Sequence, residues 1–103
     1  MARDDQGSAR VSVKFAIDPV VEKLDLTPKA ARTDILSRAG QLTPDEFAHR
    51  NEERSPPADV YGVTHQGFGW YVKVKLQPAT LLHVLSFHPP ERPLRTKSGM
   101  ISR

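Results

Sequence analysis

One segment near the middle of the chain alternates strictly between apolar and polar residues, and it restricts the possible folds more than any other feature. The segment covers residues 70–77. Its apolar members are Trp70, Val72, Val74 and Leu76, and its polar members are Tyr71, Lys73, Lys75 and Gln77. Side chains of a strand point alternately to its two faces. The pattern therefore predicts a strand with one buried face and one exposed face that carries a phenol and two ammonium groups.

The runs on either side of this segment predict a small sheet. Apolar alternation predicts a first strand over residues 11–17 that ends at Asp18-Pro19, followed by a short helical turn over 20–24. Two more strands are predicted over 60–65 and 81–88, and a glycine-bearing turn over 66–69 precedes the central strand. Such short connections favour an antiparallel meander of three strands.

Capping residues predict two helices between the first strand and the meander. Thr27 is a good N-cap, Pro28 suits the first helical position, and Gly40 suits the far end. Thr43 supplies a second N-cap, and we expect a second helix over 44–53 whose main apolar anchor is Phe47.

The order of these elements indicates an α+β fold. An N-terminal strand and two helices precede a three-stranded antiparallel meander, and the helices are expected to pack on one face of the sheet. With 103 residues the chain is long enough for one domain, which we place at 11–88. We expect residues 1–10 to be disordered and residues 89–103 to form a basic, proline-bearing tail with little regular structure.

Charge is distributed unevenly along the chain. Residues 1–59 hold nine Lys/Arg and eleven Asp/Glu, whereas residues 60–103 hold six Lys/Arg and a single acidic residue, Glu91. The second part contains the amphipathic strand, so the excess of positive charge indicates an anionic partner on that side. Ordinary solubility charge is the alternative explanation at this magnitude.

The composition excludes several classes of site. The chain has no cysteine, which rules out disulfides, thiolate metal sites and cysteine nucleophiles. No apolar run approaches the ~20 residues of a membrane span, and the acidic N-terminus is unlike a secretory signal, so we expect a cytoplasmic protein without membrane association. The four histidines have no recognised metal-ligand spacing, and we expect neither metal nor cofactor.

The remaining residues suit metal-free cleavage of RNA, a substrate that carries its own nucleophile in the 2′-OH. Such a reaction needs a group that takes a proton, cations that stabilise charge on the phosphate, and a donor to the leaving oxygen. The predicted catalytic residues are His49, Tyr71, Lys73 and His88. The predicted RNA-binding residues are Arg50, Lys75, Arg92 and Arg95.

Several of these residues also have a purely structural explanation. Lys73 and Lys75 suit a solvated strand face, and Tyr71 suits cross-strand packing. His88 precedes two prolines and would serve as a strand end. His83 lies five residues before it, so in a regular strand the two face opposite sides, and His83 is expected to be a buried or rim residue.

Several short stretches resemble the MqsR family of toxins, within the wider RelE-like group of ribonucleases from bacterial toxin–antitoxin systems. In the meander these are residues 59–61, 70–74 (Trp-Tyr-Val-Lys-Val) and 85–88 (Leu-Ser-Phe-His). Residues 42–47 (Leu-Thr-Pro-Asp-Glu-Phe) resemble the segment that precedes the meander. The resemblance implies a RelE-like fold and a toxin that cuts mRNA without a metal, whether free or ribosome-bound, and is neutralised by a cognate antitoxin.

The chain departs from the family pattern at three positions. Tyr71 and Lys73 match the strand motif, but His49 and His88 stand where the family usually has lysine, and Ala58 where it often has glutamine. Imidazoles keep a protonatable group but change its pKa and reach. Catalysis could therefore run differently or be lost. The alternative function is a non-catalytic module that binds nucleic acid or an acidic protein through the basic face, or a small subunit whose tail docks onto a larger assembly.

Overall fold

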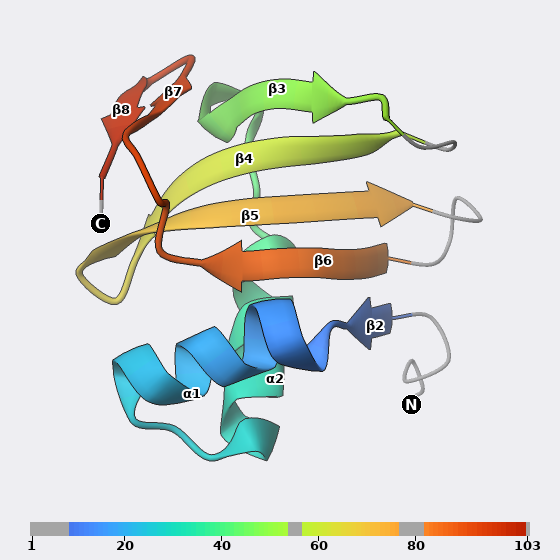
Figure 1. Cartoon of the computed structure of the whole chain (residues 1–103), viewed down its shortest axis with the longest axis vertical. Helices are drawn as coiled ribbons and strands as arrows, with labels where there is room; N and C mark the ends of the chain where they lie inside the picture. The colour runs from blue at the N-terminus through green and yellow to red at the C-terminus, as the bar shows by residue number, and fades with distance from the viewer. Residues whose placement is uncertain (1–8, 54–56, 77–81, 103) are drawn as a thin grey trace.

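The computed structural model describes residues 9–53, 57–76 and 82–102, which form an α+β fold (Figure 1). The elements are β2 (Ala9–Val11), the π-helical turn η1 (Val13–Ile17), α1 (Asp18–Leu24), α2 (Pro28–Ala39), the 3-10 turn η2 (Pro44–Glu46), β3 (Phe47–Asn51), β4 (Ala58–His65), β5 (Phe68–Leu76), β6 (Leu82–His88), β7 (Leu94–Thr96) and β8 (Gly99–Ile101). The N-terminal residues 1–8 and the strand ends predicted at Gln77 and Leu81 lie outside the described residues. Ala9 and Arg10, predicted to be disordered, belong to β2.

A five-stranded mixed sheet in the order β2-β6-β5-β4-β3 forms the centre of the fold. The pairs β3–β4, β4–β5 and β5–β6 are antiparallel, and β2 runs parallel to β6. The predicted meander is confirmed as β4, β5 and β6, and it is extended by one strand on each side. Among the described residues, no helix has the length and apolar character that a membrane crossing needs.

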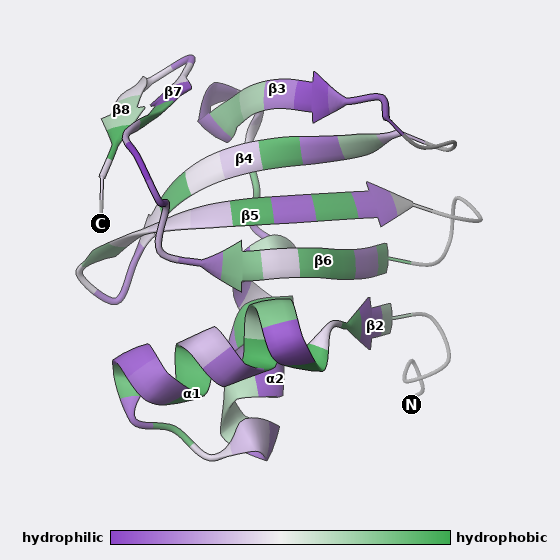
Figure 2. Ribbon diagram, viewed as in Figure 1, coloured by the Kyte–Doolittle hydropathy of each residue, from purple (hydrophilic) through white to green (hydrophobic). Residues whose placement is uncertain are grey.

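Helices cover one face of this sheet, as expected. Helix α2 passes behind the strands in Figure 1, while η1 and α1 lie against β6. Ala16, Val20 and Ile35 from these helical segments form one buried cluster with Trp70 and Val72 of β5. The alternation predicted for β5 is visible along its ribbon in Figure 2, and its apolar set faces the helices.

Helix α2 begins and ends where its capping residues predict. The Thr27 hydroxyl accepts a hydrogen bond from the Ala30 backbone N–H at 3.1 Å, which satisfies a donor of the first turn. Pro28 occupies the first helical position and Gly40 follows the last. Ala31 and Ile35 are fully buried, so the helix packs on the sheet through the face that carries them.

The predicted first strand over 11–17 is wrong beyond Val11. The Ser12 hydroxyl accepts from the Phe15 N–H at 3.3 Å, and the Ile17 N–H reaches the Ser12 carbonyl at 3.0 Å, which winds the chain into η1. Pro19 then lies in the first turn of α1 rather than after a strand. Ala16 and Val20 are both buried and lie four residues apart, which is the spacing of one helix face rather than the alternation of a strand.

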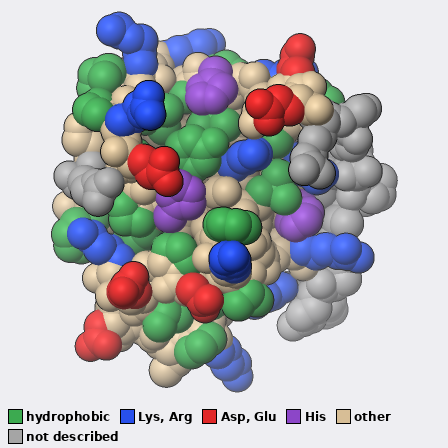
Figure 3. All heavy atoms as spheres, in the orientation of Figure 1, with side chains coloured by type: hydrophobic (Ala, Val, Ile, Leu, Met, Phe, Trp, Pro, Cys, Tyr) green, Lys and Arg blue, Asp and Glu red, His purple; other side chains and the backbone are tan. Residues whose placement is uncertain are grey.

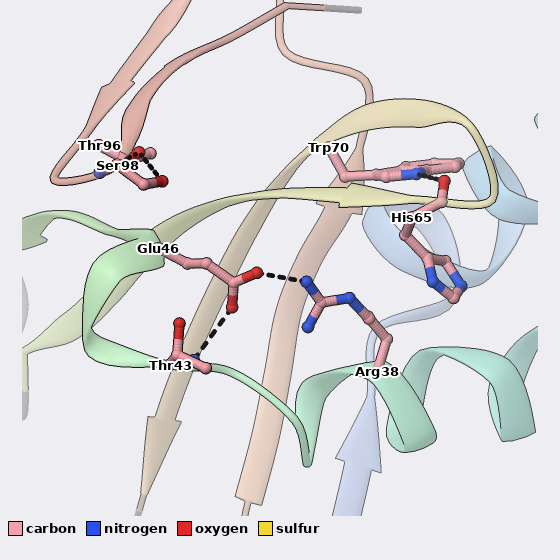
Figure 4. Close-up of polar contacts among 7 residues, drawn as sticks. All are labelled: Arg38, Thr43, Glu46, His65, Trp70, Thr96 and Ser98. Carbon is pink, nitrogen blue, oxygen red and sulfur yellow. Dashed lines mark hydrogen bonds and ion pairs between the residues drawn. The ribbon is translucent and has the colours of Figure 1, made fainter.

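The predicted helix over 44–53 is also wrong, although its N-cap is real. The Glu46 carboxylate accepts from the Thr43 N–H at 3.0 Å and pairs with Arg38 at the end of α2 (Figure 4). This turn stops at Glu46, and residues 47–51 form the edge strand β3. In a helix, the residues one turn after Phe47 would be Arg50 and Asn51, so the helix would lack an apolar face. In the strand, Phe47 instead packs against Tyr61 of β4.

The tail predicted over 89–103 contains a hairpin of β7 and β8, which corrects the expectation of little regular structure. The hairpin packs on two glycines, because a Cβ on Gly62 would lie 2.7 Å from the Thr96 methyl group and one on Gly69 would lie 2.0 Å from the Ser102 carbonyl. At its tip, the Lys97 N–H reaches the Phe47 carbonyl at 3.2 Å. The hairpin therefore covers one end of the sheet on the side away from the helices.

Candidate functional site

The open face is the face of the sheet opposite α1 and α2, in the part that the hairpin leaves uncovered. Its residues are His49 and Asn51 of β3, Ala58 and Val60 of β4, Tyr71, Lys73 and Lys75 of β5, and His83, Ser86 and His88 of β6. Figure 3, in the orientation of Figure 1, shows histidine side chains on this side of the molecule among basic, acidic and apolar ones. The exposed face of β5 thus lies next to the imidazoles of β6, and His49 lies on the same face beyond β4.

A bulge in β6 brings the histidines of that strand to the same face. Tyr71 pairs with His88 and Lys73 with Ser86, but Val74 pairs with Val84 and Lys75 with His83, which leaves Leu85 as the extra residue. The expectation that His83 and His88 face opposite sides is therefore wrong. His83 pairs with a lysine on the open face, and its pKa is lowered by burial and then by the charges of Lys75 and Arg10.

Tyr71 and His88 form a stacked pair at the centre of the site. Their ring centroids lie 5.0 Å apart with an interplanar angle of 13°. The Nδ1 of His88 lies 2.9 Å from the Pro89 carbonyl, and since a carbonyl can only accept, Nδ1 carries the hydrogen. This bond fixes the ring and makes Nε2 the nitrogen that exchanges a proton.

Burial and a nearby carboxylate keep the Tyr71 hydroxyl protonated. Desolvation is the main cause of its raised pKa, and the negative charge of Glu91 raises the pKa further. A phenol with a raised pKa keeps its proton at neutral pH, so it is not available as a base but still has a hydrogen to donate. Tyr71 is therefore suited to donate to an anionic substrate oxygen.

His49 and Arg92 face this pair across an open cavity of about 500 Å³, which is called the Tyr71–His88 cavity. His49 is exposed on β3, and Arg92 is exposed on the segment that links β6 to β7. In Figure 1 that segment crosses in front of the sheet, so it forms one wall of the cavity while β5 and β6 form the floor. Three of the four predicted catalytic residues, His49, Tyr71 and His88, therefore line a single cavity.

Lys73, the fourth predicted catalytic residue, lies on the same face of β5, two residues after Tyr71. It pairs with Ser86 on β6 and Val60 on β4, and Ser86 lines both the Tyr71–His88 cavity and a second cavity that contains Lys73 and Lys75. Val60 is fully buried beneath these polar groups. The lysine thus extends the site along β5.

Two predicted RNA-binding residues point elsewhere. Arg50 alternates with His49 on β3, and its Nε lies 2.8 Å from the Asp59 carboxylate on the helix-facing side. Arg95 is exposed on β7, where its neighbours Leu94 and Thr96 face the sheet instead. The structure does not bring Arg50 or Arg95 to the open face. The position predicted for His49 and Arg50 on a helix is likewise wrong.

Sequence reasoning missed Ser86 and Glu91. Ser86 lies two residues before His88 in the regular part of β6, so the alternation of that strand was a signal that it shares the face of His88. Glu91 reaches Tyr71 because the segment after Pro89 turns back over the sheet, and its isolated negative charge in the basic part of the chain was the signal available there.

Among the residues that the structure describes, no three His, Asp or Glu side chains cluster as metal ligands would. No family model, curated protein or solved structure significantly matches the chain. A function can therefore be inferred only from the residues of the open face.

Proposed function

We propose that this protein is a metal-independent endoribonuclease that cleaves RNA through attack of the 2′-OH on the adjacent phosphodiester. The observation that carries the proposal is the stacked Tyr71–His88 pair, which lines one cavity with His49 on the open face that also carries Lys73. Two imidazoles from different strands line this cavity together with the hydroxyl of Tyr71 and the guanidinium of Arg92. A RelE-like toxin fold is part of the same proposal.

The proposed mechanism assigns the two proton transfers to the two histidines. His49 takes the proton of the 2′-OH as O2′ attacks phosphorus. The bond to O5′ breaks, and His88 gives its Nε2 proton to the departing oxygen. The products are a 2′,3′-cyclic phosphate and a free 5′-OH. His49 is the base here rather than Tyr71, since the raised pKa of Tyr71 opposes loss of its proton.

The other residues of the site stabilise charge on the phosphate. Lys73 offers a cation on the strand that also holds Tyr71, whose hydroxyl donates to a non-bridging oxygen, and Arg92 approaches from the opposite wall. Fixed donors directed at a developing charge are worth more than the same groups in water. Both Lys73 and Arg92 retain the roles that the sequence predicted for them.

The proposal includes mRNA in the cytoplasm as the substrate and a cognate antitoxin as the partner, as the family resemblance implies. Growth arrest on induction, relieved by co-expression of a small neighbouring gene, would support this part. Growth that is unaffected by induction at high expression would contradict it.

End-labelled RNA incubated with the purified protein in EDTA tests the chemistry. We expect fragments that end in 2′,3′-cyclic phosphate, and no cleavage of the same sequence made with 2′-O-methyl nucleotides, which lack the nucleophile. RNA that is bound but stays intact at excess protein would contradict the proposal and favour the non-catalytic binding module.

Substitution of the Glu91 carboxylate should improve RNA binding and lower the pKa of Tyr71. In Glu91→Gln the negative charge that raises this pKa is lost, so the tyrosine should ionise at lower pH, and the site should repel phosphate less. We expect RNA affinity to rise about twofold to fivefold at low salt, with a smaller gain at high salt.

The phenol can be titrated by absorbance in a Tyr61→Phe background, because the chain has only two tyrosines. Glu22→Gln on α1 is the control for net charge, since Glu22 is exposed on the helix side of the molecule. Equal gains in affinity for both variants, or an unchanged Tyr71 titration in Glu91→Gln, would show that Glu91 does not act on the site.

A further inference from the structure

The cleavage reaction leaves both histidines of the Tyr71–His88 cavity in the protonation state opposite to the one in which they start. His49 has gained the proton of the 2′-OH, and His88 has given its Nε2 proton to O5′. The 2′,3′-cyclic phosphate at the new end of the RNA is still a phosphodiester, with a negative charge and non-bridging oxygens. Cleavage therefore ends with a reactive ester in the cavity that an acid, His49, and a base, His88, both line.

The hydrogen bond of His88 decides which of its nitrogens is free after this step. Its Nδ1 keeps the hydrogen that is directed at the Pro89 carbonyl, 2.9 Å away. A neutral imidazole carries a single N–H, so Nε2 then has a free lone pair. The ring is also stacked on Tyr71 with the centroids 5.0 Å apart, which holds it in the same place. The nitrogen that served as the acid is thus the nitrogen that can next take a proton.

Such an exchange of roles suits imidazoles better than amines. His49 and His88 stand where the toxin family that the sequence resembles usually has lysine. Imidazole gains and loses a proton close to neutral pH. The amine of lysine has an ordinary pKa of about 10.4, so at neutral pH it stays protonated and does not readily take a proton from water. The chain therefore departs from the family pattern at the two positions that would have to act in both directions.

The Tyr71–His88 cavity has room for water beside a bound phosphate. Its volume is about 500 Å³, and a water molecule occupies about 30 Å³ in the liquid. When the fragment with the 5′-OH has left, water can take the position of O5′. Tyr71 and Arg92 line the same cavity, so they can hold the non-bridging oxygens of the cyclic ester as proposed for the RNA.

We propose that the site is also a cyclic phosphodiesterase, which hydrolyses the 2′,3′-cyclic phosphate to a 3′-phosphate. His88 takes a proton from water through Nε2 as the water oxygen attacks phosphorus. The bond from phosphorus to O2′ breaks, and His49 returns its proton to O2′. The product is a 3′-phosphate monoester beside a free 2′-OH, and both histidines are back in their starting state.

This inference rests on the proposed endoribonuclease function and adds a second substrate class to it, the nucleoside 2′,3′-cyclic phosphates. Cyclic ends are then the first product of RNA cleavage, and 3′-phosphate ends are the final one. The second step should be the slower one, because the shortened RNA has lost the contacts of the departing fragment.

Adenosine and cytidine 2′,3′-cyclic phosphates, incubated with the purified protein in EDTA, test this activity in the absence of RNA. Phosphorus NMR distinguishes the cyclic ester from the 2′- and 3′-monoesters. We expect the 3′-phosphate alone, because His49 returns its proton to O2′. The matched control is adenosine 3′,5′-cyclic phosphate, which should stay intact since its O2′ is not bonded to phosphorus. Formation of the 2′-phosphate, or no hydrolysis at excess protein, would overturn the inference.

The two histidine variants test the exchange of roles directly. His49→Ala and His88→Ala should each slow hydrolysis by about 10²-fold to 10⁴-fold. In the remaining hydrolysis, His88→Ala should lose the acidic limb of the pH–rate profile, which reports the base, and His49→Ala should lose the alkaline limb. In RNA cleavage each variant should lose the other limb. The same limb lost in both reactions, or a hydrolysis rate that neither substitution changes, would contradict the exchange.

RNA cleavage by the same preparations separates this inference from the function on which it rests. We expect end-labelled fragments with cyclic ends at early times and with 3′-phosphate ends later. Cyclic ends that persist at long times with excess protein would contradict the hydrolysis alone. Hydrolysis of the cyclic nucleotides by a protein that leaves RNA intact would contradict the nuclease proposal alone.

Discussion

His88→Ala should reduce RNA cleavage by about 10²-fold to 10⁴-fold while RNA binding changes little, because the variant loses the acid that protonates the leaving oxygen. His88 is held by its bond to the Pro89 carbonyl and by the stack on Tyr71, so its Nε2 is the nitrogen available for transfer. Single-turnover cleavage rates with excess protein measure the chemical step, and filter binding of 2′-O-methyl RNA measures affinity separately.

Three readouts distinguish this role from a merely structural one. The pH–rate profile of the wild type should be bell-shaped, and His88→Ala should lose its alkaline limb, which reports the acid. Free imidazole added to His88→Ala should restore part of the rate. The midpoint of thermal unfolding should stay close to that of the wild type, since His88 lies at the end of a strand. A cleavage rate within about threefold of the wild type would rule out His88 as the acid.

The strand at the centre of the site could be predicted because its pattern is local and long. From Trp70 to Lys75 each residue occupies the face that the alternation assigns to it. Helix α2 could be predicted for a related reason, since Thr27 and Gly40 determine its ends through nearby backbone contacts. The position of Tyr71 and Lys73 on the same face follows from the same period.

Other parts of the site depend on pairings between distant residues, which a single sequence does not display. The bulge at Leu85 forms where β6 meets β5, and it moves His83 to the open face. The edge strand with His49 depends on pairing with β4, although Thr43 and Pro44 start a helical turn just before it. In each case the tertiary pairing overrides the local preference.

The hairpin of β7 and β8 could not be predicted from the sequence either. Each of its strands has only three residues, which is too short for a period to be recognised. The absence of side chains at Gly62 and Gly69, far away in the sequence, lets it approach the sheet closely, and backbone hydrogen bonds from Lys97 and Ser98 attach its tip. The need for glycine at these two positions becomes visible only when the hairpin that covers them is known. The segment that leads into the hairpin carries Arg92 to the site.

Trp70→Ala should destabilise the protein by about 3–5 kcal/mol, the usual cost of removing a buried tryptophan side chain. A domain of this size has a total stability of only about 5–15 kcal/mol, so the variant should be close to unfolding. Trp70 is fully buried, its ring lies 5.1 Å from that of Phe87, and its indole N–H donates to the His65 carbonyl at 2.9 Å. His65 in turn pairs with Asp34 of α2 at 2.7 Å, so this residue links the sheet to the helices.

One further variant separates the apolar contribution of Trp70 from its hydrogen bond, and a second serves as an exposed control. Trp70→Phe keeps most of the buried ring but leaves the His65 carbonyl without its donor, which should cost about 1–3 kcal/mol. Val13→Ala, at a position that is 61% exposed, should change the free energy of unfolding by about 0.5 kcal/mol or less. Urea denaturation followed by circular dichroism measures all three. Since Trp70 directly precedes Tyr71 on β5, a Trp70→Ala protein of unchanged stability would show that the alternation of this strand does not position the site.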